Sequence, residues 1–373
     1  MKKEIKIIFH IDLNAFFASC AIIKEPYLAD NPFVVGRGYG SKRGIVCTAS
    51  YSARKHGIRS GMSIADAYKI YPSLRVVPTD YNLYVKNSEI FFKFLKKYTS
   101  IMIAGSIDEA YLDMTELSKT RHPLEIAKEI QDTLNSEYKL PVSIGISSTL
   151  FLAKMGSDMK KPLGITVLRK KELVSKLFPL SIANMYGIGK KTYPRLQEMG
   201  IITIGDFVKE TNKDKILSIM SLESYNSYID CTMGRSNDVI DPSQYSIPKS
   251  ISTETTLVYP RVGIEVLQPI IKELYEEIFD KLKKEAMKAR TFGIRLKDAE
   301  FNTITRSKTI IEYTDDFHIG YEIIEELLDA NHQNREIRLV GVYIKELILI
   351  KDLKDDYNLF NYQELSAREK KYL

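Results

Sequence analysis

The feature that most constrains this chain is a pair of adjacent acids inside an apolar stretch. Residues 101–113 read IMIAGSIDEAYLD, with strand-like apolar residues on both sides of Asp108 and Glu109. Neighbouring carboxylates in a partly buried place repel each other and lose hydration. A surface turn would tolerate the pair without any function, whereas a bound divalent cation would compensate its charge. The pattern predicts two short strands with a tight connection near Gly105 and Ser106.

The segments around this hairpin follow the order strand, helix, insert, strand, strand, helix, strand. Residues 4–12 (EIKIIFHID) alternate as a strand that ends at Asp12, and LNAFFASCAII continues with helical spacing. Residues 123–138 have helical spacing, and PVSIGISS supplies the last strand. In this split βαβ order the first strand lies centrally beside the hairpin. Asp12 is therefore expected to face Asp108 and Glu109, which is poor for stability and good for Mg²⁺.

The length of 373 residues is consistent with roughly two to four domains. Residues 26–78 form a Gly- and Pro-rich insert, residues 171–235 a helical segment, and residues 237–249 a polar linker. The split βαβ order then recurs without a matching acid trio. Its strand segment 290–308 is rich in Arg and Lys, so a basic sheet facing duplex phosphates is expected.

Composition and charge narrow the class of protein. No apolar run reaches membrane-spanning length, and the charged, alternating start is unlike a signal peptide. The cysteines, Cys20, Cys47 and Cys231, fit neither a zinc site nor a disulfide framework, so a cytoplasmic protein away from membranes is expected. The net charge is +6, and the basic first hundred residues indicate either a phosphate-bearing partner or an ordinary solvated face.

Two segments carry groups that suit a triphosphate. VCTASYSARKHGIRSGM places Thr48, Tyr51, Arg54 and Lys55 close together, where Arg offers a planar fork to phosphate. DMKKPLG offers Lys160 and Lys161 before a turn. Either segment alone could equally be a solvated basic surface.

A third segment, MYGIGKKTYPRLQEMGI, resembles a helix–hairpin–helix. Gly187 and Gly189 would let backbone N–H groups approach a DNA phosphate, and Lys190 and Lys191 would add charge. Gly200 ends the following helix where expected.

The three acids fit two-metal phosphoryl transfer. Asp12 and Asp108 are placed to bridge the cations, Glu109 is the third ligand, and the backbone carbonyl of Leu13 is a further candidate.

Together the motifs resemble those of Y-family translesion DNA polymerases. HIDLNAFFAS, TASYSARKHGIRSGM, SIDEAYLD, SIGISSTLFLAKMGSDMKKPLG and YGIGKKT stand in that family's order and spacing, and the resemblance runs from about Ile8 to Ile350. It implies an α+β multidomain right hand with a split βαβ palm and a second split βαβ domain. The implied division is palm 1–26 and 79–168, fingers 27–78, thumb with the helix–hairpin–helix 169–236, linker 237–248, little finger 249–350 and tail 351–373.

The resemblance also implies the activity. It is template-directed, error-prone DNA synthesis in DNA repair and the SOS response, by nucleotidyl transfer from a dNTP to a primer 3′-OH. Two Mg²⁺ ions, with Mn²⁺ as an alternative, would be held by Asp12, Asp108, Glu109 and the Leu13 carbonyl. The protein would act as a monomer on primer-template DNA.

Further roles carry over residue by residue. Phe17 would be the steric gate that collides with a ribose 2′-hydroxyl, and Phe16 would lie beneath the nucleotide. The triphosphate would be held by Thr48, Tyr51, Arg54 and Lys161, and the templating base would lie near Cys47 and Gly61.

The tail and the branch of the family leave alternatives open. DYNLF resembles a sliding-clamp-binding peptide in which Leu359 and Phe360 would be the apolar anchors, although the tail could instead fold back on its own domain. Tyr186 before GIG resembles the polymerase V catalytic subunit, whereas SIDEAYLD and the length favour the polymerase IV branch.

Two rival functions remain at this point. A nucleotide cyclase uses similar acids and a triphosphate, but it needs no grip on DNA. A DNA-binding accessory protein that has lost catalysis would not need all three acids.

Overall fold

The computed structural model describes residues 5–36, 44–236, 238–242, 247–332 and 335–353. The chain separates into two compact units, Met1–Pro242 and Ser243–Leu373, and the boundary falls inside the predicted linker. Among the described helices none is both long and apolar enough to cross a membrane.

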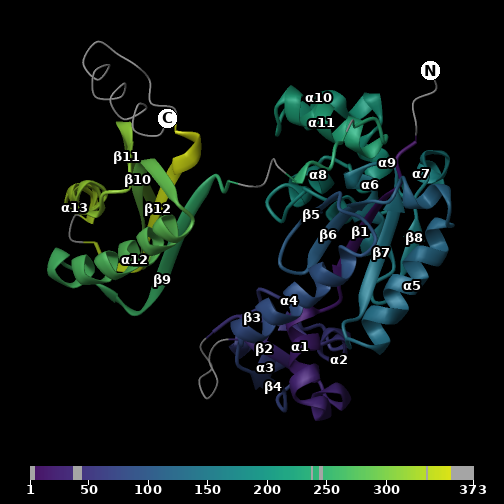
Figure 1. Cartoon of the computed structure of the whole chain (residues 1–373), viewed down its shortest axis with the longest axis horizontal. Helices are drawn as coiled ribbons and strands as arrows, with labels where there is room; N and C mark the ends of the chain where they lie inside the picture. The colour runs from purple at the N-terminus through teal and green to yellow at the C-terminus, as the bar shows by residue number, and fades with distance from the viewer. Residues whose placement is uncertain (1–4, 37–43, 237, 243–246, 333–334, 354–373) are drawn as a thin grey trace, which may run out of the picture. The chain divides into compact units, whose positions relative to one another are not determined.

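The first unit is built on a five-stranded sheet in the order β5-β6-β1-β7-β8 (Figure 1). β1 lies at the centre, antiparallel to both β6 and β7, while β7 and β8 are parallel. The predicted split βαβ order is therefore confirmed. The strands are β5 Met102–Ala104, β6 Glu109–Asp113, β1 Ile8–Leu13, β7 Val142–Ser147 and β8 Ile165–Val167.

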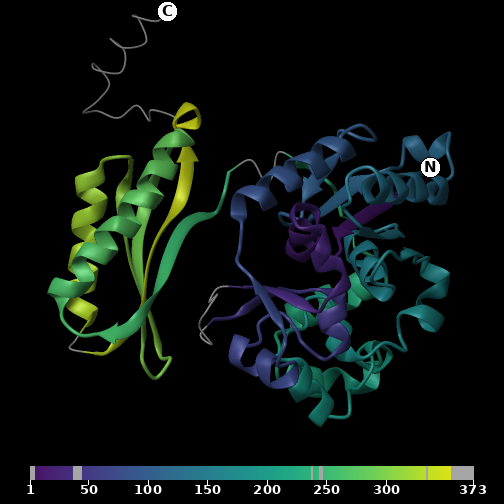
Figure 2. The same cartoon turned by 90° about the horizontal axis from the view of Figure 1, so that it is seen from below.

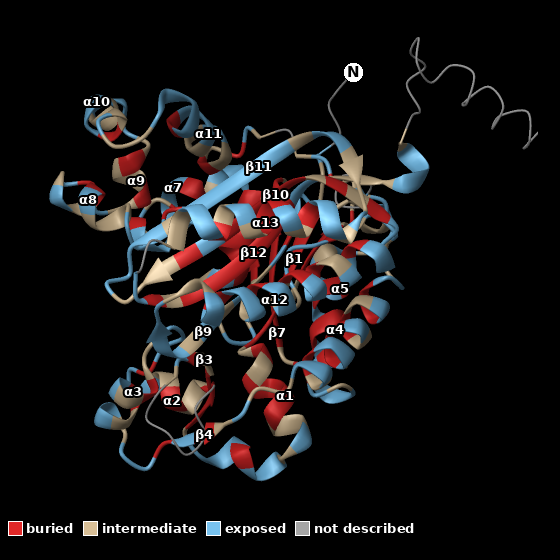
Figure 3. Ribbon diagram, turned by 90° about the vertical axis from the view of Figure 1, so that its left-hand side faces the viewer, coloured by how far each residue is buried: buried red, intermediate tan, exposed pale blue. Residues whose placement is uncertain are grey.

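Helices cover both faces of this sheet, so every residue of β1 and β7 is buried (red in Figure 3). Alternate residues of a strand point to opposite faces. Phe9, Ile11 and Leu13 of β1 belong to the main apolar core, which includes side chains of α4 and α5. His10 and Asp12 point the other way, toward α6. The helices are α1 Phe16–Lys24, α4 Tyr81–Leu95, α5 Pro123–Ser136 and α6 Leu150–Met159.

Two glycines let α6 lie unusually close to β7. A Cβ atom at Gly145 would lie 1.9 Å from the carbonyl oxygen of Ala153, and one at Gly156 would lie 3.2 Å from the Cα of Gly145. Real Cβ atoms do not make contacts as short as the first of these. The helix and the strand therefore pack backbone to backbone.

The insert between α1 and α4 forms its own small layer. Its strands make a sheet in the order β3-β2-β4, packed on a separate apolar core that includes Val34, Ile58 and Ile64. Ser50 and Ser63 cap the two helices with their side chains. The elements are β2 Phe33–Gly36, β3 Val46–Ala49, β4 Arg75–Val77, α2 Tyr51–Lys55 and α3 Ile64–Ile70.

Short helices follow the sheet and complete the first unit. They enclose a further apolar core that includes Leu196, Ile204 and Phe207. The predicted helix–hairpin–helix begins with a short 3-10 helix, η4, rather than with a full α-helix. The elements are α7 Leu173–Lys176, η4 Ile182–Asn184, α8 Tyr193–Glu198, α9 Ile204–Phe207, α10 Lys213–Leu217 and α11 Leu222–Thr232.

The second unit repeats the split βαβ order in a four-stranded sheet, β11-β10-β12-β9. Its two helices lie on one face of the sheet (Figure 2). Helix α12 ends at Lys284, because Ala286 turns the chain at φ 49° and Met287 starts a strand opposite Leu349. The elements are β9 Ser250–Arg261, α12 Ile264–Lys284, β10 Met287–Asp298, β11 Thr303–Thr314, α13 Phe317–His332 and β12 Ile337–Leu349.

Candidate active site

Asp12 and Glu109 lie directly opposite each other on the paired strands β1 and β6. The backbone carbonyl of Asp108 accepts the N–H of Leu13 at 2.9 Å, so the strand end and the hairpin meet as the sequence predicts. The Asp108 side chain accepts a hydrogen bond from Ser106 beside it. The structure thus brings the three acidic positions together.

Two lysines lie against these acids. The Lys154 ammonium of α6 is 3.2 Å from Oδ2 of Asp12 and also contacts Glu109. The Lys161 ammonium is 2.6 Å from Oδ1 of Asp12 and 2.8 Å from Oδ1 of Asp158. Sequence reasoning singled out Lys161 but missed Lys154.

The donor set fits a hard cation such as Mg²⁺, although within the described ranges no three acid, His or Cys side chains form a ready metal cage. The side chains of Asp12 and Glu109 are 8% and 23% exposed, and both offer only oxygen ligands. The ammonium of Lys154 neutralises the same carboxylates that a cation would use. Cation binding would therefore require this ammonium to loosen its contacts.

The pKa values of Asp12 and Glu109 are shifted in opposite directions. Burial, with the hydrogen bond to Glu109, raises the pKa of Asp12 to about 7 despite the nearby lysines. Burial also opposes ionisation of Glu109, but the side chains of His10, Asp12 and Lys154 beside it outweigh burial and lower the pKa of Glu109. Without a cation, the proton of the pair therefore belongs to Asp12.

His10 lies beside Glu109 on the face of β1 that is turned toward α6. Its Nδ1 is 2.7 Å from the hydroxyl of Ser157, and its Nε2 is 3.8 Å from Oε2 of Glu109. The ring is fully buried and lies 4.5 Å from that of Tyr111. Burial lowers the pKa of His10, so the imidazole is neutral at physiological pH.

A tyrosine hydroxyl near the acids is buried beside two cations. The Tyr51 hydroxyl has no hydrogen-bond partner within the part of the chain that the structure describes. Burial raises its pKa, while the charges of Arg54 and Lys161 oppose that rise, so both cations lie near it. The Arg54 guanidinium lies 4.9 Å from the centre of the Tyr51 ring. Thr48 stands on β3, shortly before them in the chain.

The two phenylalanines after Asp12 have different surroundings. Phe17 is partly exposed and stacks on Tyr84 of α4, with ring centres 4.0 Å apart and planes 12° apart. Phe16 is 2% exposed and belongs to the core. Ala15, at φ 45°, turns the chain into α1. Only Phe17 therefore presents a ring to a substrate.

Cys47 and Gly61 lie near each other in the insert. The N–H of Gly61 donates to the carbonyl of Val46 at 2.8 Å, one residue before Cys47. No atom lies within 4 Å of where a Gly61 Cβ would stand, and its φ of +83° favours glycine. The surface at Gly61 is therefore open.

The glycine loop before α8 is held by a tyrosine. Gly187 has a φ of +90°, and its carbonyl accepts the Tyr228 hydroxyl at 2.9 Å. A Cβ atom added at Gly189 would meet nothing within 4 Å, and Lys190 and Lys191 are exposed. Backbone and cations are both accessible at this loop.

In the second unit one sheet face is free of the two helices. Phe292, Ile294 and Leu296 of β10 point into the helix-covered core, so Arg295 and Lys297 point to the other face. The opposing positions of that face are mostly small or polar, namely Ser252, Glu254, Thr256, Thr303, Thr305, Ser307, Gly341 and Tyr343, with Leu339 among them.

The expectation that the basic residues of segment 290–308 lie on a sheet face turned to duplex phosphates is wrong in part. Lys308 pairs with Phe292 in the register and forms an ion pair with Glu326 of α13 at 2.7 Å, so it lies on the helix-covered side. The residues proposed for clamp binding, Leu359 and Phe360, lie outside the described residues.

Comparison with known proteins gives long matches. The sequence profile of the impB/mucB/samB family matches residues 11–158, and that of its C-terminal domain matches residues 248–356. DNA polymerase IV of Oceanobacillus iheyensis is 34% identical over 367 residues, 98% of this chain and 87% of that protein. DNA polymerase IV 1 of Bacillus subtilis is 35% identical over 366 residues, with the same two shares.

Solved structures agree with the sequence matches. A Y-family DNA polymerase chimera of Dbh and Dpo4 aligns with a TM-score of 0.81 at 26% identity, covering 92% of this chain and 99% of that one. DinB from Sulfolobus solfataricus aligns with a TM-score of 0.63 at 26% identity, with the same coverage. The chain therefore belongs to the impB/mucB/samB family, the Y-family polymerases that its sequence motifs resemble.

Proposed function

We propose that this protein is a DNA-directed DNA polymerase that copies damaged templates with low fidelity, by nucleotidyl transfer from a dNTP to a primer 3′-OH. The observation that carries the proposal is the meeting of Asp12, Asp108 and Glu109 at one end of the central strand. DNA polymerase IV relatives and Y-family polymerase structures match nearly the whole chain, which supports the same activity.

The metal-dependent step is assigned to these acids. Asp12, Asp108, Glu109 and the Leu13 carbonyl would hold two Mg²⁺ ions, with Mn²⁺ as an alternative. Bound there, the ions would activate the primer hydroxyl and stabilise the leaving pyrophosphate. Lys154 would keep the carboxylates in place until the ions enter, because it contacts both Asp12 and Glu109.

The nucleotide is assigned to the groups beside the acids. Thr48, Tyr51, Arg54 and Lys161 would bind the triphosphate, and the unpartnered Tyr51 hydroxyl supports this role. Phe17 would act as the steric gate, since Tyr84 holds its ring by stacking. Phe16 would support the nucleotide from beneath, through the core in which it is buried.

The template and the duplex are assigned to open surfaces. Cys47 and Gly61 would leave room for a distorted templating base. Gly187, Gly189, Lys190 and Lys191 would contact DNA phosphates, and so would the hydroxyl-rich face of the second unit. Related structures include an insertion ternary complex of Dbh DNA polymerase, in keeping with DNA and a nucleotide as partners.

We further propose the domain names and the cellular setting. The five-stranded sheet with its helices would be the palm, the insert the fingers, the short helices the thumb and the second unit the little finger. The three cysteines are free, which suits the cytosol. The protein would act as a monomer and would bind a sliding clamp through Leu359 and Phe360.

Primer extension on defined damaged templates tests the function. Purified protein with four dNTPs and Mg²⁺ should extend a primer past the lesion, and Asp108→Ala should abolish extension while duplex binding persists. Asp66→Asn, a change at an exposed acid of α3, is the matched control and should extend normally. DNA binding without extension by the wild type would support the accessory protein, and a cyclic nucleotide product would support the cyclase.

The clamp proposal has its own test. Leu359→Ala combined with Phe360→Ala should remove binding to a purified sliding clamp and leave distributive extension unchanged. Clamp binding of undiminished affinity would refute this part of the proposal alone.

A further inference from the structure

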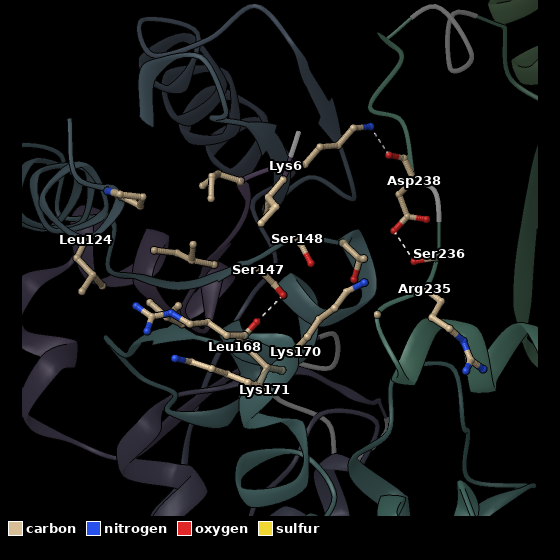
Figure 4. A pocket seen from close by; sticks show the side chains of 18 of the residues that line it. Lys6, Leu124, Ser147, Ser148, Leu168, Lys170, Lys171, Arg235, Ser236 and Asp238 are labelled. Atoms are coloured by element: carbon tan, nitrogen blue, oxygen red, sulfur yellow. Dashed lines mark hydrogen bonds between the residues drawn. The ribbon is translucent and has the colours of Figure 1, made fainter. Parts of the chain in front are cut away.

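A cavity lies at the end of the sheet away from the acids. Its volume is about 700 Å³, and it is lined by the segment before β1, the end of β7, the end of β8 and the segment after it, the start of α5, residues 234–236 and Asp238 (Figure 4). This volume falls in the range of binding pockets, about 300–1,000 Å³. All of its walls belong to the first unit.

The cavity is separate from the candidate active site. Ile7, just before β1, lines it, and Asp12 follows five residues later, near the other end of that strand. At about 3.3 Å per residue, a strand places these positions roughly 17 Å apart. A ligand in the cavity would not contact the acids.

The floor of the cavity is aliphatic. Ile7, Ile146 and Leu168 line it, and Ile146 and Leu168 are 3% and 1% exposed. At its mouth Ile5 and Leu124 are 74% and 41% exposed. Such apolar side chains gain free energy when a partner covers them.

The mouth also carries three consecutive cations. Arg169, Lys170 and Lys171 line the cavity, and none of them has an ion-pair partner among the side chains of the described residues. The other two cations of the lining are already engaged. Lys6 donates to the carbonyl of Asp238 at 2.6 Å, and Arg235 pairs with Asp230 at 2.9 Å.

The one acid of the lining does not neutralise these cations. The Asp238 carboxylate accepts the N–H of Leu150 at 2.9 Å and the hydroxyl of Ser236 at 3.0 Å. On the other wall the hydroxyl of Ser147 donates to the carbonyl of Leu168 at 2.6 Å (Figure 4). These bonds fix the walls, so the cavity is formed before any ligand arrives.

We propose that this cavity is a docking site for a short acidic and apolar segment of a partner protein. Apolar side chains of the segment would fill the aliphatic floor, and its carboxylates would pair with Arg169, Lys170 and Lys171. The partner would thus bind at the end of the sheet away from Asp12, Asp108 and Glu109, and it would leave these acids accessible.

The lining does not suit a nucleic acid. Single strands bind to aromatic platforms on which bases stack. His122 is the one aromatic side chain among the lining residues, and its Nδ1 accepts the N–H of Leu124 at 3.3 Å. An aliphatic floor offers nothing to a phosphate backbone.

The test uses the full chain and a fluorescein-labelled probe peptide, Asp-Asp-Leu-Phe-Asp-Leu-Asp, followed by fluorescence anisotropy. Binding should saturate, and Lys170→Glu combined with Lys171→Glu should weaken it at least tenfold. Leu124→Asp should do the same. Lys86→Glu, at an exposed cation on α4 outside the cavity, is the matched control and should leave binding unchanged.

Two altered peptides separate the apolar and the charged contributions. Replacing Leu and Phe by Ser, or Asp by Lys, should each abolish binding. All protein variants should extend a primer as the wild type does. The outcome of the docking test is therefore independent of whether the protein is a polymerase.

Four results would overturn the proposal. These are no binding of the probe, binding that ignores the cavity variants, competition by single-stranded DNA that the same variants weaken, and concentration-dependent self-association that Leu124→Asp removes. The last would show that a second copy of the chain covers the cavity.

Discussion

The backbone N–H of Leu163 donates a hydrogen bond of 2.8 Å to the side-chain oxygen of Asn14. Asn14 is buried in the turn between Asp12 and Phe17, and its amide donates to the Ser143 hydroxyl at 2.9 Å. Leu163 comes two residues after Lys161. The loop that carries Lys161 is therefore fastened to the turn that follows Asp12.

Asn14→Ala should raise the KM for dNTP about tenfold and change kcat less, because Lys161 loses its anchor. It should also lower the free energy of unfolding by about 1 kcal/mol, since the N–H of Leu163 and the hydroxyl of Ser143 lose a hydrogen-bond partner. Steady-state primer extension and chemical denaturation measure both effects. Asn87→Ala removes another buried amide, bonded to Leu83, and should cost stability without moving the KM. An unchanged KM in the Asn14 variant would show that Asn14 stabilises the fold but does not position Lys161 for the nucleotide.

Lys154→Met should destabilise the metal-free protein by about 3–5 kcal/mol, because removing one partner of a buried ion pair leaves the other charge unpaired. Mg²⁺ should restore part of this loss by taking the place of the ammonium. Thermal unfolding in EDTA and in Mg²⁺ should thus show a larger metal-dependent rise in Tm than for the wild type. Lys176→Met, at an exposed ion pair with Glu172, should leave both melting curves nearly unchanged. Equal metal shifts in all three proteins would contradict the idea that lysine and cation share the acids.

Phe17→Ala should admit ribonucleotides, because the ring that would collide with a 2′-hydroxyl is gone. Discrimination between dNTP and NTP, as the ratio of the two kcat/KM values, should fall at least roughly tenfold. Tyr84→Leu removes the stacking partner and leaves the gate. It should give a smaller loss of discrimination. Sugar selectivity equal to that of the wild type in Phe17→Ala would remove the gate role.

Metal affinity should rise with pH up to about 7 and then level off. The raised pKa of Asp12, about 7, means that this acid holds a proton below that pH and must release it before a cation can bind. Calorimetric titration with Mn²⁺ in buffers of different ionisation enthalpy should detect proton release that is larger at pH 6 than at pH 8. Release that stays constant across this range would show that Asp12 is already ionised.

The catalytic geometry was predictable because it rests on local patterns. The alternation that ends at Asp12 and the hairpin that carries Glu109 determine the register, and the register places the two side chains opposite each other. Such pairing follows from the two-residue alternation of the strands and from the order of the elements along the chain.

The supporting residues were harder to predict because they depend on how separate elements pack. Lys154 stands in LFLAKMGSDM, where a lysine among apolar residues reads as an ordinary helix position. A lysine followed four residues later by Asp158 was the only sign of an ion pair. His10 and Asn14 gave no sign, since their roles depend on Ser157 and Leu163, far along the chain.

The glycine contact between α6 and β7 sets a distance on which the chemistry depends. Because Gly145 and Gly156 leave no side chain between helix and strand, backbone sterics alone fix how far the Lys154 ammonium extends over the sheet. Apolar residues elsewhere in the core can drift in size over evolution without altering that reach. A methyl group added at Gly145 would push α6 away from β7. Lys154 would then move away from Asp12 and Glu109, although Gly145 itself contacts neither acid.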